Sequence, residues 1–510
     1  MGYAAPQERY GCVTDLRAPN ATAAKSLLEP GRNCWRVEQA DRAALIVDAA
    51  DYYRMAFEAM VEAKSQIILI GWDIDTRVRL VEERHASGAP RALGPLLSWL
   101  SKRRPELQIY VLAWDEGLVS IPGRGTTILR MLRWWADRKV TIKWDSRHPL
   151  DASHHMKLLV IDDAVAYCGG IDITASRWDT RGHKDEEPGR RRPFTGRRYE
   201  PWHDAIMAVD GAAAKALGDL GRKRWEIATD RRLPAPEGEG DPWPDELKPT
   251  FRNVQIAIAR TRGKDGEISQ VREIEALFMD LIAAAQEHVY IETQYFASRT
   301  IAEAIAKRLE EPDGPEFVVV NPRSGEGWLD EGVMGPARYE LMQALRAKDK
   351  HGRFRIYTPV TKQGADIYVH AKVMIVDDRG LRVGSANINN RSMGLDSECD
   401  VLVDGATDEV RETIAKLRSE LMAEHLGVEL QVVEECFADT GSLIETIERL
   451  RGSGRTLLPF EPPRPNKAKR AMARSEAMDP EAPDELFEPS ARPGLLSRLG
   501  ARRRRGGRAP

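Results

Sequence analysis

The feature that most constrains this chain is an internal repeat of the short motif His-x-Lys-x4-Asp. It occurs at His155–Asp162 and again at His370–Asp377. In both copies the residues after the lysine are apolar, which is typical of a buried strand that begins just after a polar turn. Residues i and i+2 of a strand project to the same face, so each histidine is expected beside its lysine.

Strand and helix patterns alternate along both halves of the chain. The first half is expected to contain helices at Ala49–Lys64, Leu93–Ser101 and Thr127–Arg138, each followed by a strand, at Gln66–Gly71, Gln108–Trp114 and Val140–Trp144. The pattern restarts with strands at Val254–Ala259, His288–Glu292, Glu316–Val320 and Phe354–Thr358 and helices at Gln270–Gln286, Ala302–Leu309 and Pro336–Ala347. This alternation predicts an α/β fold of two similar α/β lobes, with mostly parallel or mixed sheets.

Composition suggests where the domains lie. We expect an N-terminal extension at 1–40, a first lobe at 41–240, a second lobe at 250–435 and a disordered basic tail at 459–510. Leu233–Pro249 is rich in Pro, Gly and acidic residues, as interdomain linkers are. His183–Arg198 is expected to form a loop over the active site. The tail is Pro-rich and charged; a solvated tail and a weak anchor to anionic lipid are both compatible with it.

Bulk properties exclude some classes of protein. The net charge of the 510 residues is -3, which argues against a polybasic nucleic-acid binder. No apolar run is long enough for a transmembrane helix, and the N-terminus lacks the pattern of a signal peptide. The five cysteines form no C-x-x-C pair, so neither a zinc site nor a disulfide framework is indicated. A cytoplasmic location is expected, with peripheral membrane attachment or signal-free export left open.

The repeated motif supplies two imidazoles and two ammonium groups, a set that suits a phosphodiester. The lysines would neutralise phosphate oxygens, while one histidine attacks phosphorus and the other protonates the leaving oxygen. Glycine-rich segments follow both copies, at Gly169–Asp172 and Gly384–Asn389, and let backbone N–H groups approach an anion. Asp162 and Asp377 complete the motif at the strand ends and are counted among the catalytic residues, although a carboxylate at a strand end can also serve a turn or a contact behind the site. This chemistry needs no metal or other cofactor, so none is expected.

The sequence around the motifs resembles the phospholipase D superfamily, also called the HKD family, and its eukaryotic-type branch in particular. The resemblance is carried by His154–Asp179 and Tyr368–Asp400, the two motif blocks, and by the shorter segments Tyr290–Phe296, Pro201–Asp204 and Gly71–Asp73. It covers roughly residues 40 to 430. It implies two α/β/α lobes with the active site at their interface.

The resemblance also implies roles for individual residues. His155 would be the nucleophile that forms a phosphohistidine, and His370 the general acid and then the base. Lys157 and Lys372 would hold the phosphate. Asn387, Ser385, Gly170, Asp172 and Trp178 are expected at the substrate, whereas Glu398 and Asp179 would each orient a catalytic histidine from behind. Trp202 is a further candidate for the pocket wall, and His203 is either structural or placed behind the site.

The leading functional hypothesis is a phospholipase D. Such an enzyme hydrolyses the distal phosphodiester bond of a glycerophospholipid such as phosphatidylcholine to phosphatidic acid and a free alcohol. A phosphatidyltransferase of the cardiolipin synthase type and a nuclease are the alternatives. The expected partner is a phospholipid at a membrane surface rather than a nucleic acid. Because one chain carries both motifs, a monomer is expected.

Overall fold

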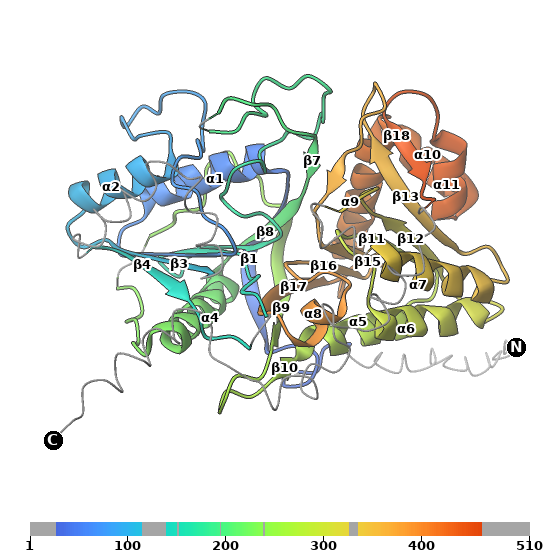
Figure 1. Cartoon of the computed structure of the whole chain (residues 1–510), viewed down its shortest axis with the longest axis horizontal. Helices are drawn as coiled ribbons and strands as arrows, with labels where there is room; N and C mark the ends of the chain where they lie inside the picture. Colours follow the sequence, from blue (N-terminus) through green and yellow to red (C-terminus); the bar gives the residue numbers. More distant parts are fainter. Residues whose placement is uncertain are drawn as a thin grey trace, which may run out of the picture.

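The computed structural model describes residues 27–114, 139–149, 152–193, 195–237, 240–325 and 335–461. The predicted helix Thr127–Arg138, most of the extension at 1–40 and nearly all of the tail at 459–510 lie outside these residues. Within the described chain, one mixed sheet of 16 strands runs through both halves of the molecule (Figure 1). No helix among the described residues is both long and apolar enough to cross a bilayer.

The two halves repeat the same strand order outward from a central antiparallel pair, β1 (Arg36–Val47) and β9 (Phe251–Arg262). From β1 the order is β8 (Ala205–Asp210), β6 (Val165–Gly169), β5 (Leu158–Ile161), β2 (Gln66–Gly71), β3 (Gln108–Trp114) and β4 (Val140–Asp145). From β9 it is β17 (Glu398–Asp404), β16 (Gly380–Gly384), β15 (Val373–Val376), β11 (His288–Glu292), β12 (Glu316–Val320), β13 (Phe354–Val360) and β18 (Thr456–Pro459), with β10 (Val271–Arg272) also paired to β9. The predicted duplication thus appears as a matching order of seven strands per half.

Strand direction follows the connections. β2, β3 and β4 are mutually parallel, as are β11, β12 and β13, whereas the strands nearer the centre pair antiparallel. Parallel neighbours need a crossover, usually a helix, and the helix patterns were predicted between just these strands. Gln66–Gly71 is buried along its whole length, because helices cover both faces of the sheet there.

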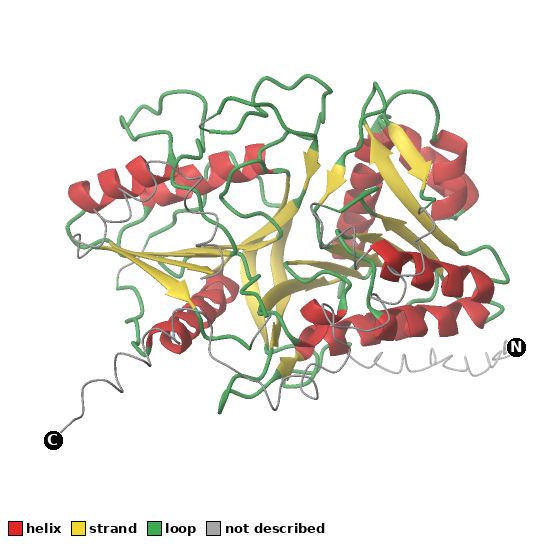
Figure 2. Cartoon of the chain, in the orientation of Figure 1, coloured by secondary structure: helices red, strands yellow, loops and turns green. Residues whose placement is uncertain are grey.

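Helices lie on both faces of the sheet (Figure 2). They are α1 (Ala49–Glu62), α2 (Leu93–Arg103) and α4 (Gly211–Thr229) in the first half and α5 (Glu273–Ala284), α6 (Arg299–Glu310), α7 (Gly335–Lys348), α8 (Asn390–Gly394), α9 (Asp408–Leu426), α10 (Leu430–Thr440) and α11 (Leu443–Leu450) in the second. One apolar core, under α4 and α9, is shared by strands of both halves, while separate cores lie under α1 and α2 and under α5 to α7. The α/β/α prediction is confirmed. Because the two halves share a core, a site formed where they join would be held rigidly.

The segment expected to link the lobes lies against the first half. Trp243 is buried in the core under α1 and α2, and the Arg42 guanidinium lies 4.8 Å from its ring centroid. The Gln66 side chain donates to the carbonyl of Pro234. The second half continues past residue 435, because α10, α11 and β18 pack onto it. The predicted domain boundaries remain predictions.

Candidate active site

The two motif segments meet where the halves join. His155 and Lys157 come just before β5, and His370 and Lys372 come just before β15. The ring centroids of the two histidines are 6.5 Å apart. The symmetric strand order accounts for this, since equivalent ends of β5 and β15 face each other across the central β1–β9 pair.

Backbone hydrogen bonds between the halves fix the position of each histidine. The His155 N–H donates to the carbonyl of Ser397 at 3.0 Å, and the His370 N–H donates to the carbonyl of His203 at 2.7 Å. β7 (Trp202–His203) and β14 (Tyr368–Val369) form a small parallel sheet that supports the second of these contacts. Each motif is therefore held by the half that does not contain it.

Each histidine also meets a carboxylate from the opposite half. His155 Nδ1 lies 3.0 and 3.1 Å from the two carboxylate oxygens of Glu398. His370 Nδ1 lies 2.6 Å from Oδ2 of Asp204. A carboxylate at Nδ1 fixes the imidazole tautomer and leaves Nε2 for chemistry. The two imidazoles are thus presented to one another as a reciprocal pair.

Both carboxylates are fully enclosed. Glu398 accepts hydrogen bonds from the hydroxyls of Ser385 at 2.5 Å and Ser392 at 2.7 Å, and burial, with the Asp396 charge, raises its pKa to about 8. Asp204 accepts from the backbone N–H of Ala205, and burial raises its pKa. Protonating either carboxyl would alter the tautomer of its histidine, so both groups link the site to pH.

The motif lysines make the site strongly cationic. The Lys157 ammonium donates to the carbonyl of His155 at 2.7 Å and lies 3.2 Å from Oδ2 of Asp172, while Lys372 donates to the carbonyl of His370. Burial lowers the pKa of Lys372 to about 7. Burial and then the nearby lysines also hold the pKa of both histidines well below 6.5. An anion bound among these groups would relieve the crowding of positive charge.

Neutral and aromatic groups complete the wall. Asn387 is buried, and its amide oxygen has no hydrogen-bond partner within the part of the chain that the structure describes. Trp202 stacks on Tyr368 at 4.5 Å between ring centroids and lies 5.2 Å from the His370 ring. The Arg177 guanidinium lies 3.9 Å from the Trp202 ring centroid. Trp202 therefore forms the wall beside His370.

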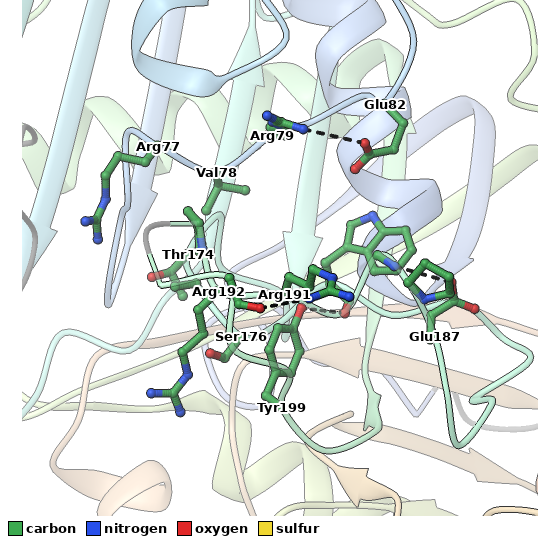
Figure 3. Close-up of a pocket in the computed structure, with 16 residues that line it drawn as sticks. Arg77, Val78, Arg79, Glu82, Thr174, Ser176, Glu187, Arg191, Arg192 and Tyr199 are labelled. Atoms are coloured by element: carbon green, nitrogen blue, oxygen red, sulfur yellow. Dashed lines mark hydrogen bonds and ion pairs between the residues drawn. The ribbon is translucent and has the colours of Figure 1, made fainter.

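Trp178 was expected at the substrate but lines a neighbouring pocket whose lining includes neither motif (Figure 3). Arginines 77, 79, 191 and 192 also line this pocket, and Figure 3 shows Arg191 and Arg192 near Tyr199. The Tyr199 hydroxyl donates to the carbonyl of Trp178. Part of the loop His183–Arg198 therefore lines this basic pocket.

The structure corrects the catalytic assignment of Asp162 and Asp377. Asp162 accepts from the backbone N–H groups of residues 64, 65 and 66, and Asp377 accepts from those of residues 286, 287 and 288. A four-residue strand separates each aspartate from its lysine by roughly 15 Å. Both side chains therefore anchor the turn that enters the neighbouring strand, β2 or β11.

The structure also corrects the role expected of Asp179. Its carboxylate accepts from His183, Arg190 and the Trp202 N–H, and the partner of His370 is Asp204. The strand pairing of the two halves shows that Asp204 is the equivalent of Glu398. Gly384 pairs with Asp400 and Gly169 pairs with Ile206, so Glu398 and Asp204 both stand two residues before the paired position.

Three residues expected at the substrate instead support the groups around it. Ser385 donates to Glu398 and accepts from the Cys399 N–H. Asp172 pairs with Lys157 and accepts from the Trp72 N–H. A Cβ atom on Gly170 would lie 2.1 Å from Oδ1 of Asp204, so glycine is required for that carboxylate to fit. Each holds one component of the site.

Comparison with known proteins agrees with this geometry. Residues 59–235 match the family model described as phospholipase D, and residues 278–423 match the one described as cardiolipin synthase, PLD-like domain. The chain is 24% identical to phospholipase D1 of Schizosaccharomyces pombe over 76% of its length, and 26% identical to phospholipase D A of Dictyostelium discoideum, also over 76%. It spans 36% of the length of each of those relatives.

Other relatives extend the likeness. Phospholipase D alpha 1 of Vigna unguiculata is 24% identical over 82% of this chain and 68% of its own. The solved structure of a phosphatidylserine synthase from Haemophilus influenzae shares the fold, with a TM-score of 0.51 at 12% identity over 81% of this chain and 97% of that one. The two family models together span more than half of the chain, which therefore belongs to the phospholipase D superfamily, and the relatives named above are eukaryotic phospholipases D.

Proposed function

We propose that this protein is a phospholipase D that hydrolyses the distal phosphodiester bond of a glycerophospholipid to phosphatidic acid and a free alcohol. The observation that carries the proposal is the reciprocal pair of imidazoles, 6.5 Å apart, each with a carboxylate of the other half at Nδ1. Phospholipases D of yeast, Dictyostelium and plants are the relatives that it resembles.

In the first step Nε2 of His155 attacks phosphorus and forms the phosphohistidine, and the bond from phosphorus to the head-group oxygen breaks. His155 carries out this attack as the neutral imidazole, which burial favours. Glu398 accepts the Nδ1–H, so the lone pair at Nε2 points to the substrate. Lys157 and Lys372 stabilise the charge that gathers on the non-bridging oxygens.

His370 gives its proton to the departing alcohol and, in the second step, removes a proton from the water that attacks the phosphohistidine. The free site disfavours a charged His370, because burial and the nearby lysines lower its pKa. A bound phosphodiester offsets the lysines, and Asp204 stabilises the imidazolium. Substrate binding therefore raises the pKa of His370, so that it carries the proton it needs as the acid.

The substrate assignment as a phosphatidylcholine-like lipid rests on the family relatives and on the surroundings of the site. Trp202 and Tyr368 give an aromatic wall beside His370, where the head group leaves. The basic pocket in Figure 3 adds arginines that suit an anionic membrane surface.

The test is a substrate comparison on the purified full chain. Vesicles of phosphatidylcholine or phosphatidylglycerol and, separately, plasmid DNA are offered with and without ethanol, and products are measured by mass spectrometry. The expected products are phosphatidic acid and, with ethanol, phosphatidylethanol, because an alcohol can replace water at the phosphohistidine. His155→Ala should abolish both, and His351→Gln, at an exposed histidine, should not. Cleavage of DNA without lipid turnover would overturn the proposal.

A further inference from the structure

Behind Asp204, outside the site between the motif histidines, lies a buried cluster of imidazoles and carboxylates. Asp48 precedes α1, His183 lies in the loop after β6, His203 ends β7, and Glu424 comes from α9 of the second half. Their ligand-capable atoms all lie within 4.8 Å of one another, and all four residues are buried. None of them takes part in the chemistry proposed above.

The spacing of these atoms fits a tetrahedral metal ion. Oε1 of Glu424 lies 3.1 Å from both His183 Nε2 and His203 Nδ1, and Oδ2 of Asp48 lies 3.3 Å from His183 Nε2. A tetrahedral zinc ion with bonds of about 2.0–2.1 Å separates its ligand atoms by roughly 3.3 Å. These three of the six ligand-to-ligand distances are therefore close to those of an occupied zinc shell.

Two of the four ligand atoms lack hydrogen-bond partners within the described chain. Oδ2 of Asp48 and Nδ1 of His203 are buried and make no well-aligned hydrogen bond, and they lie close only to other members of the cluster, 3.3 Å from His183 Nε2 and 3.1 Å from Glu424 Oε1. An unpaired buried polar atom costs about 1–3 kcal/mol, so such atoms call for a ligand. In addition, Asp48 and His183 have positive φ values of 69° and 37°, a conformation that non-glycine residues adopt only at a cost.

The outer contacts are those of metal-bound histidines. His183 Nδ1 lies 3.1 Å from Asp179, and His203 Nε2 lies 2.8 Å from Glu292. A metal-binding histidine typically donates its second ring N–H to a carboxylate, which fixes the nitrogen that faces the metal. Both histidines have this arrangement, and in both the remaining nitrogen faces the cluster.

The equivalent place in the other half is built differently. Ser397 stands where His203 does, and behind it Asp145 forms a direct ion pair with Arg224 of α4 at the core. The opposite charges of Asp145 and Arg224 neutralise each other. Behind Asp204, the nearby guanidiniums lie at the edge of the cluster. Arg181 donates to Oε2 of Glu424, and the Arg455 guanidinium lies 3.7 Å from Oε1 of Glu424. The centre of the cluster is left to imidazole and carboxylate atoms.

We infer that Asp48, His183, His203 and Glu424 bind one divalent transition-metal ion, for which zinc has the best-fitting geometry. Nitrogen and carboxylate donors in a tetrahedron suit zinc better than calcium or magnesium, which prefer six or more oxygens. The expectation that no metal is needed concerned the reaction, and this ion lies outside it. A surface cavity lined by His183, Glu424 and Arg455 gives the ion a route inward.

The proposed ion is structural and acts on Asp204 through the backbone. Asp48 accepts the Asp204 N–H at 3.0 Å, and the Asp48 N–H donates to the Asp204 carbonyl at 2.8 Å. His203 is the residue before Asp204, and Glu424 brings α9 of the second half into the same shell. One metal ion would therefore join the two halves directly behind the carboxylate that meets His370.

The test measures metal content in the full chain, independently of any activity. Protein is produced in zinc-supplemented medium, dialysed against metal-free buffer and analysed by mass spectrometry for Zn, Mn, Fe and Ca. We expect about one Zn²⁺ per chain. His183→Gln should lose the ion, whereas His351→Gln, at an exposed histidine, should keep it. X-ray absorption at the zinc edge should show four N/O neighbours at about 2.0 Å, including imidazole.

A second measurement covers the case in which His183→Gln fails to fold. A strong zinc chelator should lower the Tm of the wild-type chain by several degrees, and added Zn²⁺ should restore it, because a ligand that binds only the folded state stabilises it. Folded wild-type protein that holds less than about a tenth of an equivalent after zinc loading would overturn the inference. Zinc retained in full by folded His183→Gln would also overturn it.

Discussion

Replacing Asp204 by Asn tests the role of the carboxylate behind His370. Asn has the same shape, so it fits the enclosed space beside Gly170, but it removes the negative charge and puts an NH₂ donor in place of one acceptor oxygen. The lost contact is the 2.6 Å pair with His370 Nδ1. A hydrogen bond to a charged group contributes about 1.5–3 kcal/mol, so turnover of phosphatidylcholine should fall roughly 10- to 150-fold.

The assay separates the acid step from the attack. Asp204→Asn is compared with Glu398→Gln on phosphatidylcholine and on phosphatidyl-p-nitrophenol, which carries p-nitrophenol in the head-group position as a good leaving group that needs no acid. With the activated substrate, Asp204→Asn should release a rapid burst of p-nitrophenol and then turn over slowly, because His370 still has to activate water. Glu398→Gln should show no burst, because its His155 attacks slowly. A full loss in Asp204→Asn on both substrates without a burst would refute the assigned roles, as would unchanged turnover.

Three further predictions concern groups around the site. Gly170→Ala should reduce turnover by about tenfold or more, because the new Cβ would lie 2.1 Å from Asp204, whereas Gly452→Ala, with open space around it, should stay within about twofold of wild type. Asp162→Asn should lower the free energy of unfolding by about 2 kcal/mol in denaturant titrations, yet leave kcat of the folded enzyme nearly unchanged; a specific loss of kcat would restore its catalytic assignment. Because burial raises the pKa of Glu398 to about 8, the folded state keeps the proton of this carboxyl between pH 4.5 and 8, and the free energy of unfolding should fall across that range. Over the same titration kcat/KM should rise through pH 8, because the ionised carboxylate selects the reactive tautomer of His155. Both trends should vanish in Glu398→Gln.

Much of the fold could be predicted from the sequence. The strands Gln66–Gly71, His288–Glu292 and Glu316–Val320 have the bounds that were predicted, because each is a short apolar run ended by polar residues. The histidines and lysines of the motif could be proposed as site residues, because their spacing and the family resemblance both pointed to them. What spacing could not show is which strands pair, and hence that one sheet passes through both halves.

The residues missed are those that act across the junction. Asp204 ends the matched segment Pro201–Asp204, but its equivalence to Glu398 is visible only in the strand pairing, so the sequence alone does not show that it meets a histidine 166 residues further along the chain. Asp162 and Asp377 were assigned by membership of the motif, although a strand points them away from the lysines. The four proposed metal ligands lie in four separate elements and form no spaced motif. Such contacts depend on the packing of the halves, which a local pattern does not contain.

The central claim is that His155 becomes covalently phosphorylated while His370 supplies and removes protons. A direct test is to mix the His370→Gln variant with phosphatidyl-p-nitrophenol, quench, digest and locate any histidine that carries the phosphatidyl group by mass spectrometry under conditions that preserve phosphohistidine. We expect an adduct of about one equivalent on His155, because without His370 the intermediate forms but water is not activated. No adduct on His155 while p-nitrophenol is released, or an adduct on another residue, would contradict it.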